Sequence, residues 1–130
     1  MKMFTEEWLN AVVEKLKNSE EFQKKGKGFD SNFQFKVLKD RKAKINNDKA
    51  FGIWFPTCDP FWYGKKADDE VDIILEAKAG VLAEVLNGKR NVVMALTMGT
   101  IKLKKGQLTK LTGNLGAVNS FISVAGSVIE

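Results

Sequence analysis

The spacing of hydrophobic residues changes twice along this chain of 130 residues, which restricts the fold to one that combines helices with a sheet. Before Gly26 the apolar residues recur every three or four positions, as on a helix with one buried face. From Asn32 to Leu38 they alternate with other residues, which is the period of a strand. After Lys78 the helical spacing returns. We therefore expect an α+β fold.

Two helices are expected at the start of the chain. Thr5 is a suitable N-cap for the first, whose apolar stripe contains Trp8, Val12 and Leu16. Ser19 is a suitable N-cap for a short second helix, because its hydroxyl can accept a hydrogen bond from the first turn. The first helix is predicted to pack on the core through its stripe.

Alternation and turn residues predict strands at about 32–38, 49–57, 70–77 and 100–104. Between the second and third strands the chain contains Pro56, Pro60 and Gly64, which predict an aromatic loop. A helix is expected at 79–86, and 92–98 fits either a buried strand or a helix.

The last segment has an apolar stripe at helical spacing from Leu108 to Ile129. Gly113, Gly116 and Gly126 each cost about 1 kcal/mol relative to alanine inside a helix, so this helix is expected to bend or break. It is also a candidate gate and a candidate homodimer contact, since its stripe must pack on its own sheet or on a second copy.

Few residues suit chemistry. The chain has no histidine, so Cys58 lacks the usual activating base and is expected to be a structural thiol. An enzyme could instead use carboxylates, which cluster at Asp68, Asp69, Glu70 and Asp72. They have no metal-ligand spacing and are more typical of a solvated turn. We expect no catalytic residue, no metal and no cofactor.

The order of these elements resembles the sterol carrier protein type 2 family. The resemblance rests on three segments, Ser19-Glu20-Glu21-Phe22, Leu86-Asn87-Gly88-Lys89 and Met98-Gly99-Thr100-Ile101-Lys102-Leu103. It covers nearly all of residues 1–130, read as a single domain. It implies a five-stranded, mainly antiparallel sheet covered on one face by helices, with an apolar tunnel between the layers. The last residues lack a Ser-Lys-Leu address, so a stand-alone prokaryotic-type member is expected.

The resemblance implies non-enzymatic binding or carriage of a lipid-like ligand, whether fatty acyl, sterol-like or isoprenoid. The residues expected to line the tunnel are Trp54, Phe55, Phe61, Trp62, Met94, Met98, Leu115, Phe121 and Ile122. Each could equally be ordinary core. Strand parity places Trp54 opposite to Ile53 and Phe55, so its place in the tunnel would need a bulge.

An alternative is an accessory protein that presents a lipid to a lipid or isoprenoid quinone biosynthetic pathway. The net charge of +5 invites a nucleic-acid partner, but the basic residues are mixed with acids, so no nucleic acid is expected. Lys36, Lys102 and Lys104 could favour transient contact with an anionic membrane. The unpaired Cys58 and the polar first helix predict a cytoplasmic protein.

Overall fold

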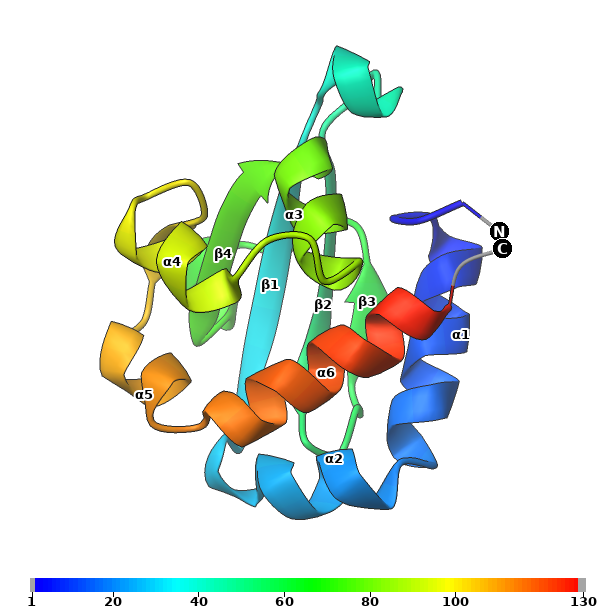
Figure 1. The fold of residues 1–130 in the computed structure, drawn as a ribbon. Helices are drawn as coiled ribbons and strands as arrows, with labels where there is room; N and C mark the ends of the chain where they lie inside the picture. The colour runs from blue at the N-terminus through cyan, green and yellow to red at the C-terminus, as the bar shows by residue number, and fades with distance from the viewer. Residues whose placement is uncertain (1, 129–130) are drawn as a thin grey trace.

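The computed structural model describes residues 2–128 as one sheet with helices packed against it (Figure 1). The strands are β1 (Ser31–Leu38), β2 (Lys49–Phe55), β3 (Phe61–Tyr63), β4 (Ile73–Lys78) and β5 (Lys102–Lys105). The α-helices are α1 (Glu6–Lys17), α2 (Glu20–Lys25), α3 (Ala79–Leu86), α4 (Val92–Thr97), α5 (Leu108–Thr112) and α6 (Leu115–Ser127). The α+β class is confirmed.

The sheet has five strands in the order β3-β2-β1-β4-β5. Three neighbouring pairs are antiparallel, and the central pair, β1 with β4, is parallel. The sheet is therefore mixed, whereas a mainly antiparallel one was expected. After β1 the chain forms β2 and β3 on one side of that strand. It then crosses to the other side of β1, where β4 pairs with it in parallel.

Strand β3 lies in the segment that the sequence predicted as a loop. Its three residues, 61–63, pair with β2, and flanking bonds extend the ladder, from Trp54 N to the Pro60 carbonyl at 2.9 Å and from Gly64 N to the Ala50 carbonyl at 2.8 Å. Prolines are tolerated beside such a short edge strand because one of its sides needs no hydrogen-bond donors. The prolines that suggested a loop thus flank a strand.

Alternation gives the sheet an inner face, which packs against helices, and an outer face. On the inner face Phe35 pairs with Phe51 of β2 and with Leu75 of β4, so the three side chains form a row across the sheet. Helices α3 and α6 lie across this face (Figure 1). This row is where the helices must pack.

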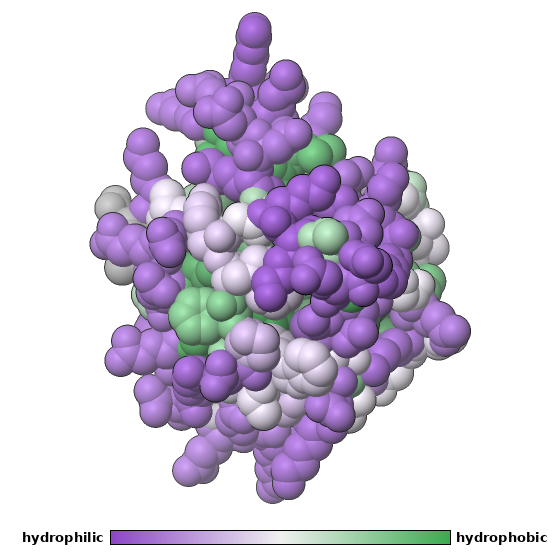
Figure 2. Space-filling view, turned by 180° about the vertical axis from the view of Figure 1, so that it is seen from behind, coloured by the Kyte–Doolittle hydropathy of each residue, from purple (hydrophilic) through white to green (hydrophobic). Residues whose placement is uncertain are grey.

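The outer face is covered in part by the segment that leads from β3 to β4. Gln34 holds this segment through two bonds to the backbone of Lys66, accepting from its N–H at 2.7 Å and donating to its carbonyl at 3.2 Å. Ile74 beneath it is 1% exposed, which explains an apolar residue on that face. Trp62 lies over Gly52, where a Cβ atom would collide with the ring. Figure 2 shows this side of the molecule, with hydrophilic side chains around a smaller pale and green area.

The predicted helix ends are largely confirmed. The hydroxyls of Thr5 and Ser19 each accept a bond from the first turn of their helix, from Trp8 N and Phe22 N, both at 3.2 Å. The C-terminal segment breaks into α5 and α6 at Gly113, as the glycines suggested. Within residues 2–128 no helix has both the length and the apolar character needed to cross a bilayer.

Candidate functional site: an apolar cavity

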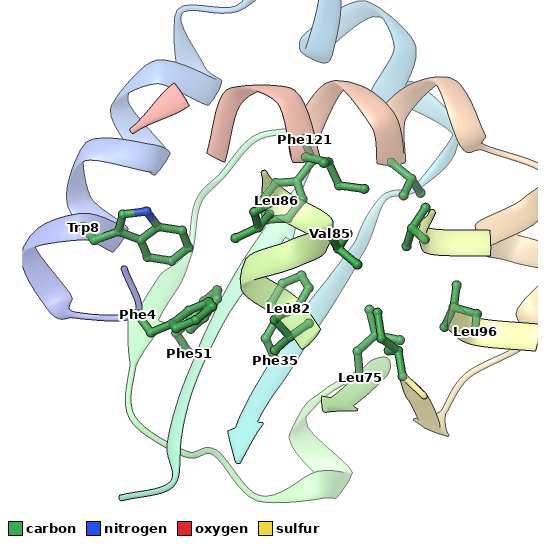
Figure 3. A pocket seen from close by; sticks show the side chains of 14 residues that line it. Phe4, Trp8, Phe35, Phe51, Leu75, Leu82, Val85, Leu86, Leu96 and Phe121 are labelled. Atoms are coloured by element: carbon green, nitrogen blue, oxygen red, sulfur yellow. The ribbon is translucent and has the colours of Figure 1, made fainter. Parts of the chain in front are cut away.

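A cavity of about 70 Å³ lies between the inner face of the sheet and helices α3, α4 and α6 (Figure 3). Its walls come from seven elements and from the residues just before α1 and β5. The lining residues are Phe4, Trp8, Phe35, Phe51, Leu75, Leu82, Val85, Leu86, Val92, Leu96, Ile101, Val118, Phe121 and Ile122.

The floor of the cavity is the row formed by Phe35, Phe51 and Leu75. The rings of Phe35 and Phe51 are stacked, with centroids 5.0 Å apart. Phe121 of α6 stacks on Phe35 at 5.5 Å with an angle of 13° between the planes, so it closes the floor against the helix layer. Strand register therefore fixes this side of the cavity.

The roof is looser than the floor. Leu82 and Leu86 of α3, Val92 and Leu96 of α4, and Ile122 of α6 are only partly buried, whereas the floor phenylalanines are buried. The roof is therefore the more exposed side of the cavity, although Leu75 of the floor is also partly buried. The side between α3, α4 and α6 is where a ligand could enter.

Trp8 and Phe4 form one end of the cavity, opposite Leu96 of α4 (Figure 3). The Trp8 ring makes edge contacts with Phe4 at 5.4 Å and with Phe51 at 5.5 Å between centroids. Trp8 is 1% exposed, and its Nε1 has no hydrogen-bond partner among the described residues. An unpaired buried donor of this kind costs about 1–3 kcal/mol.

Of the residues predicted to line a tunnel, Phe121 and Ile122 line this cavity. Phe55 does not, although it is on the inner face and 2% exposed. It belongs to a packed aromatic group in which its ring lies 5.3 Å from Phe22, 5.9 Å from Phe29 and 4.6 Å from Phe33. Large rings fill the space there, so that part of the core leaves no hollow.

Three other predicted residues lie elsewhere because of strand parity and edge position. Trp54 is on the outer face, where its Nε1 donates to Asp30 Oδ1 at 3.3 Å. Trp62 is also on the outer face, under Lys66, whose Nζ lies 4.5 Å from the ring centroid. Phe61 is on the inner face of the edge strand β3, beyond the described cavity lining, with Lys17 Nζ 5.9 Å from its ring.

The last three predicted residues also lie outside the described lining. Met94 and Met98 are 61% and 74% exposed, because α4 directs Val92 and Leu96 inward instead. Leu115 is partly buried at the start of α6, one turn before the first α6 residue that reaches the cavity, Val118. Met94 lies on the exposed side of α4 and Met98 directly follows this helix, whose type the sequence left open.

Between the layers where a tunnel was predicted, the structure has a small cavity. Pockets that enclose a drug-sized ligand measure roughly 300–1,000 Å³, well above the 70 Å³ of this cavity. A long-chain ligand would therefore require the roof to move. A continuous tunnel stays a prediction.

The cavity contains no reactive group among the residues that the structure describes. Cys58 is buried outside it, and burial raises the pKa of its thiol to about 11, an effect only partly opposed by the positive charge of Lys17. Asp68, Asp69 and Glu70 form an exposed turn. Within residues 2–128 no cluster of histidine, cysteine or carboxylate side chains could hold a metal ion.

The lysines predicted to meet a membrane lie on the outer face or its edge. Lys36 pairs with Asp68 at 3.3 Å and Lys104 approaches Glu76 at 4.0 Å, so part of their charge is neutralised. Lys102 is exposed on β5. These side chains are on the opposite side of the sheet from the cavity.

Comparison with solved structures identifies the fold. A crystal structure of sterol carrier protein 2 superposes with a TM-score of 0.85 at 28% identity, covering 98% of this chain and 100% of that chain. The chain has the sterol carrier protein 2 fold. The family resemblance predicted from the sequence is confirmed by this match. No protein-family model matches the sequence, and neither does any curated protein.

Two further structures show the range of the sterol carrier protein 2 fold. A conserved hypothetical protein of Thermus thermophilus, described as possibly a sterol carrier protein, has a TM-score of 0.83 at 28% identity, covering 100% of this chain and 92% of that chain. Sterol carrier protein 2 of Aedes aegypti, in complex with the C16 fatty acid palmitate, has a TM-score of 0.60 at 10% identity. It covers 95% of this chain and 98% of that chain.

Most of the residues that line the cavity were not predicted from the sequence. Alternation does place Phe35, Phe51 and Leu75 on one face, but only the register shows that they are neighbours in one row. Trp8 was expected in the core on the stripe of α1, and no sequence signal distinguishes core from cavity wall there. The signal that could have found Leu82 and Leu86 is the apolar face of 79–86.

Proposed function

We propose that this chain binds and carries a lipid-like hydrophobic molecule between its sheet and helices α3, α4 and α6. One observation carries the proposal: every described residue that lines the cavity is apolar or aromatic, in a layer whose sheet side is otherwise closely packed. Burial of an acyl chain is favourable by about 0.8 kcal/mol per methylene, so such a lining is sufficient for retention. Palmitate in the Aedes aegypti protein of the same fold supports this reading.

We further propose that α4 moves to admit the ligand. This helix has six residues and lies between Gly88 and Gly99, which have φ values of +76° and +77°. Glycine adopts this left-handed backbone without strain, so both ends of the segment can change direction at low cost. Val92 and Leu96 would leave the cavity with the helix and enlarge it.

Binding without catalysis is the form of this proposal that the residues support. The sequence has no histidine, and the only cysteine has a raised pKa and lies outside the cavity. The ligand class, whether fatty acyl, sterol-like or isoprenoid, and a role in presenting it to a biosynthetic pathway stay predictions. Residence in the cytoplasm and a homodimer through α6 also stay predictions.

We also propose transient contact with an anionic membrane, through the surface of α4 and not through the lysines that the sequence suggested. Met94 on α4 and Met98 directly after it form an exposed apolar surface beside the roof of the cavity, whereas the predicted lysines lie on the other side of the sheet. Flotation with phosphatidylserine vesicles tests this contact. Binding that survives the double substitution Met94→Ser and Met98→Ser would reject α4 as the contact.

Native mass spectrometry of the freshly purified chain tests the proposed binding directly. We expect a mass excess that solvent extraction removes, and uptake of an apolar fluorescent probe by the extracted protein. A protein that carries no extractable molecule and takes up no probe or long-chain compound would overturn the proposal.

A further inference from the structure

The segment that joins β1 to β2 has exposed cations that the proposed function does not use. Residues 39–48 form a hairpin that projects past the end of α3 (Figure 1). Its cations are exposed, and none of the ion pairs described within residues 2–128 includes one of them. These cations are Lys39, Arg41, Lys42 and Lys44. This end of the molecule therefore presents positive charge that no described ion pair neutralises.

The two carboxylates of the hairpin accept hydrogen bonds from the backbone. Asp40 accepts from Lys42 N at 3.2 Å and from Gly80 N of α3 at 3.0 Å. Asp48 accepts from Lys39 N at 2.8 Å. These bonds hold the hairpin in one shape and join it to a helix that roofs the cavity. The cations are thus displayed on an ordered projection.

Lys44 lies at the corner of the hairpin in a backbone conformation that favours glycine. Its φ is +62°, and on either side of it Asp40 and Ile45 exchange backbone hydrogen bonds of 2.8 and 3.1 Å. Residues other than glycine, asparagine and aspartate are uncommon in this conformation. Strained residues are frequent where the side chain has a function, so a charged one at the tip favours a role for its charge.

The chemistry of the tip favours one class of partner. Residues 39–48 contain no aromatic side chain on which a base could stack and only a three-residue helical turn, too short to read a groove of DNA. The exposed large apolar side chains described within residues 2–128 lie elsewhere, at Met94, Met98 and Leu108, so the tip has nothing to insert into a bilayer. Charge complementarity with carboxylates remains.

We propose that residues 39–48 dock on an acidic surface of a partner protein through their four exposed cations. A projecting hairpin fits a partner whose carboxylates line a concave surface. The inference goes beyond the proposed function and does not depend on a ligand in the cavity. Because Asp40 is bonded to Gly80 of α3, the docked partner would lie beside the helices that roof the cavity.

The first test measures binding of a peptide of about ten glutamates to the wild-type chain and to two variants of equal charge. One variant replaces the four hairpin cations by glutamine. We expect it to bind at least about tenfold more weakly, because several charge pairs are lost. The control replaces four other exposed lysines and should stay within about twofold of wild type. Its positions are Lys15, Lys17, Lys24 and Lys27. Equal losses in the two variants would overturn the proposal.

Lys44→Gly separates the charge at the tip from the structure of the hairpin. Glycine adopts a φ of +62° without strain, so the urea midpoint should change little. Peptide binding should weaken about two- to threefold, because one exposed charge pair is lost, and Lys44→Arg should retain it. Peptide binding that is unchanged in Lys44→Gly would overturn the proposed contact at the tip.

A DNA duplex and phosphatidylserine vesicles test the class of partner. We expect the hairpin variant to lose less affinity for each of them than for the peptide, because an extended anionic surface also meets cations of other elements. A larger loss for the duplex or the vesicles would make a nucleic acid or a membrane the partner and overturn the proposal.

Amide NMR shifts of the wild-type chain provide a measurement that depends on no variant. The glutamate peptide should shift residues 39–48 and Gly80 most, since the hairpin is bonded to α3 there. Larger shifts at other elements would overturn the assignment of the docking surface. Every result is independent of lipid binding, so failure of this inference leaves the proposed function unchanged.

Discussion

The two halves of the layer between sheet and helices differ in how they are filled. Around Phe55 the rings of Phe22, Phe29 and Phe33 interlock at edge-to-face and tilted angles, with centroids 4.6–5.9 Å apart. Around Leu82 the roof consists of partly buried aliphatic residues of α3, α4 and α6, and a cavity remains. The comparison shows that the core is closely packed where rings of α2, of β1 and β2 and of the segment before β1 meet, and hollow where a floor of rings faces aliphatic side chains of α3, α4 and α6.

The largest expected difference between the halves is in stability. Leu16 is fully buried beside α2, whereas Leu82 is partly exposed and lines the cavity. Leu16→Ala should lower the free energy of unfolding by about 3–5 kcal/mol, and Leu82→Ala by about 1–2 kcal/mol, because less packing is lost beside an existing hollow. Urea unfolding measures both. Equal losses would show that the two halves are packed alike.

The outer face offers a test of tight packing away from both halves. A Cβ at Gly52 would collide with the Trp62 ring, so Gly52→Ala should cost about 1–3 kcal/mol in unfolding free energy. Combining it with Trp62→Ala should make the double variant more stable than the sum of the single effects predicts. Strict additivity of the two would contradict the contact.

Filling the hollow should affect binding more than stability. Val92 of α4 lines the cavity and its neighbour Val93 does not, although both are partly buried. Val92→Phe should reduce affinity for dodecane about tenfold, which is about 1.4 kcal/mol, because the new ring occupies space that the ligand needs. Val93→Phe is the matched control. Similar affinities in the two variants would place the binding site elsewhere.

The smallest expected signal comes from the thiol in the packed part of the molecule. Because burial raises the Cys58 pKa from 9.0 to about 11, the native thiol is protonated at pH 8 and should resist alkylation by iodoacetamide until the chain unfolds. The protonated form is favoured in the folded state, so the Cys58 contribution to stability is present below pH 9 and is lost as the pH rises toward 11. Cys58→Ala should remove that part of the pH dependence.

Local signals predicted much of the fold. The caps at Thr5 and Ser19, the alternation in β1 and the break near Gly113 depend on residues close in sequence, so they could be read without a structure. The same reasoning failed for β3, because its prolines suggest a loop while its pairing with β2 is a long-range contact. For the site, Phe121 and Ile122 are the predicted lining residues that lie in the described cavity lining, and the other assignments stay predictions.

The sequence by itself determined the class of the fold and the inward face of each long strand, because these follow from the spacing of apolar residues and from local hydrogen bonds. The order of its elements and three short segments carried the family resemblance. Tertiary structure decided the parallel pairing of β1 with β4, the packing of the Trp62 ring over Gly52 and the position of the cavity. The physical reason is that a cavity is the space that packed elements fail to fill. It depends on how α3, α4 and α6 are placed over the sheet, and no residue encodes that alone.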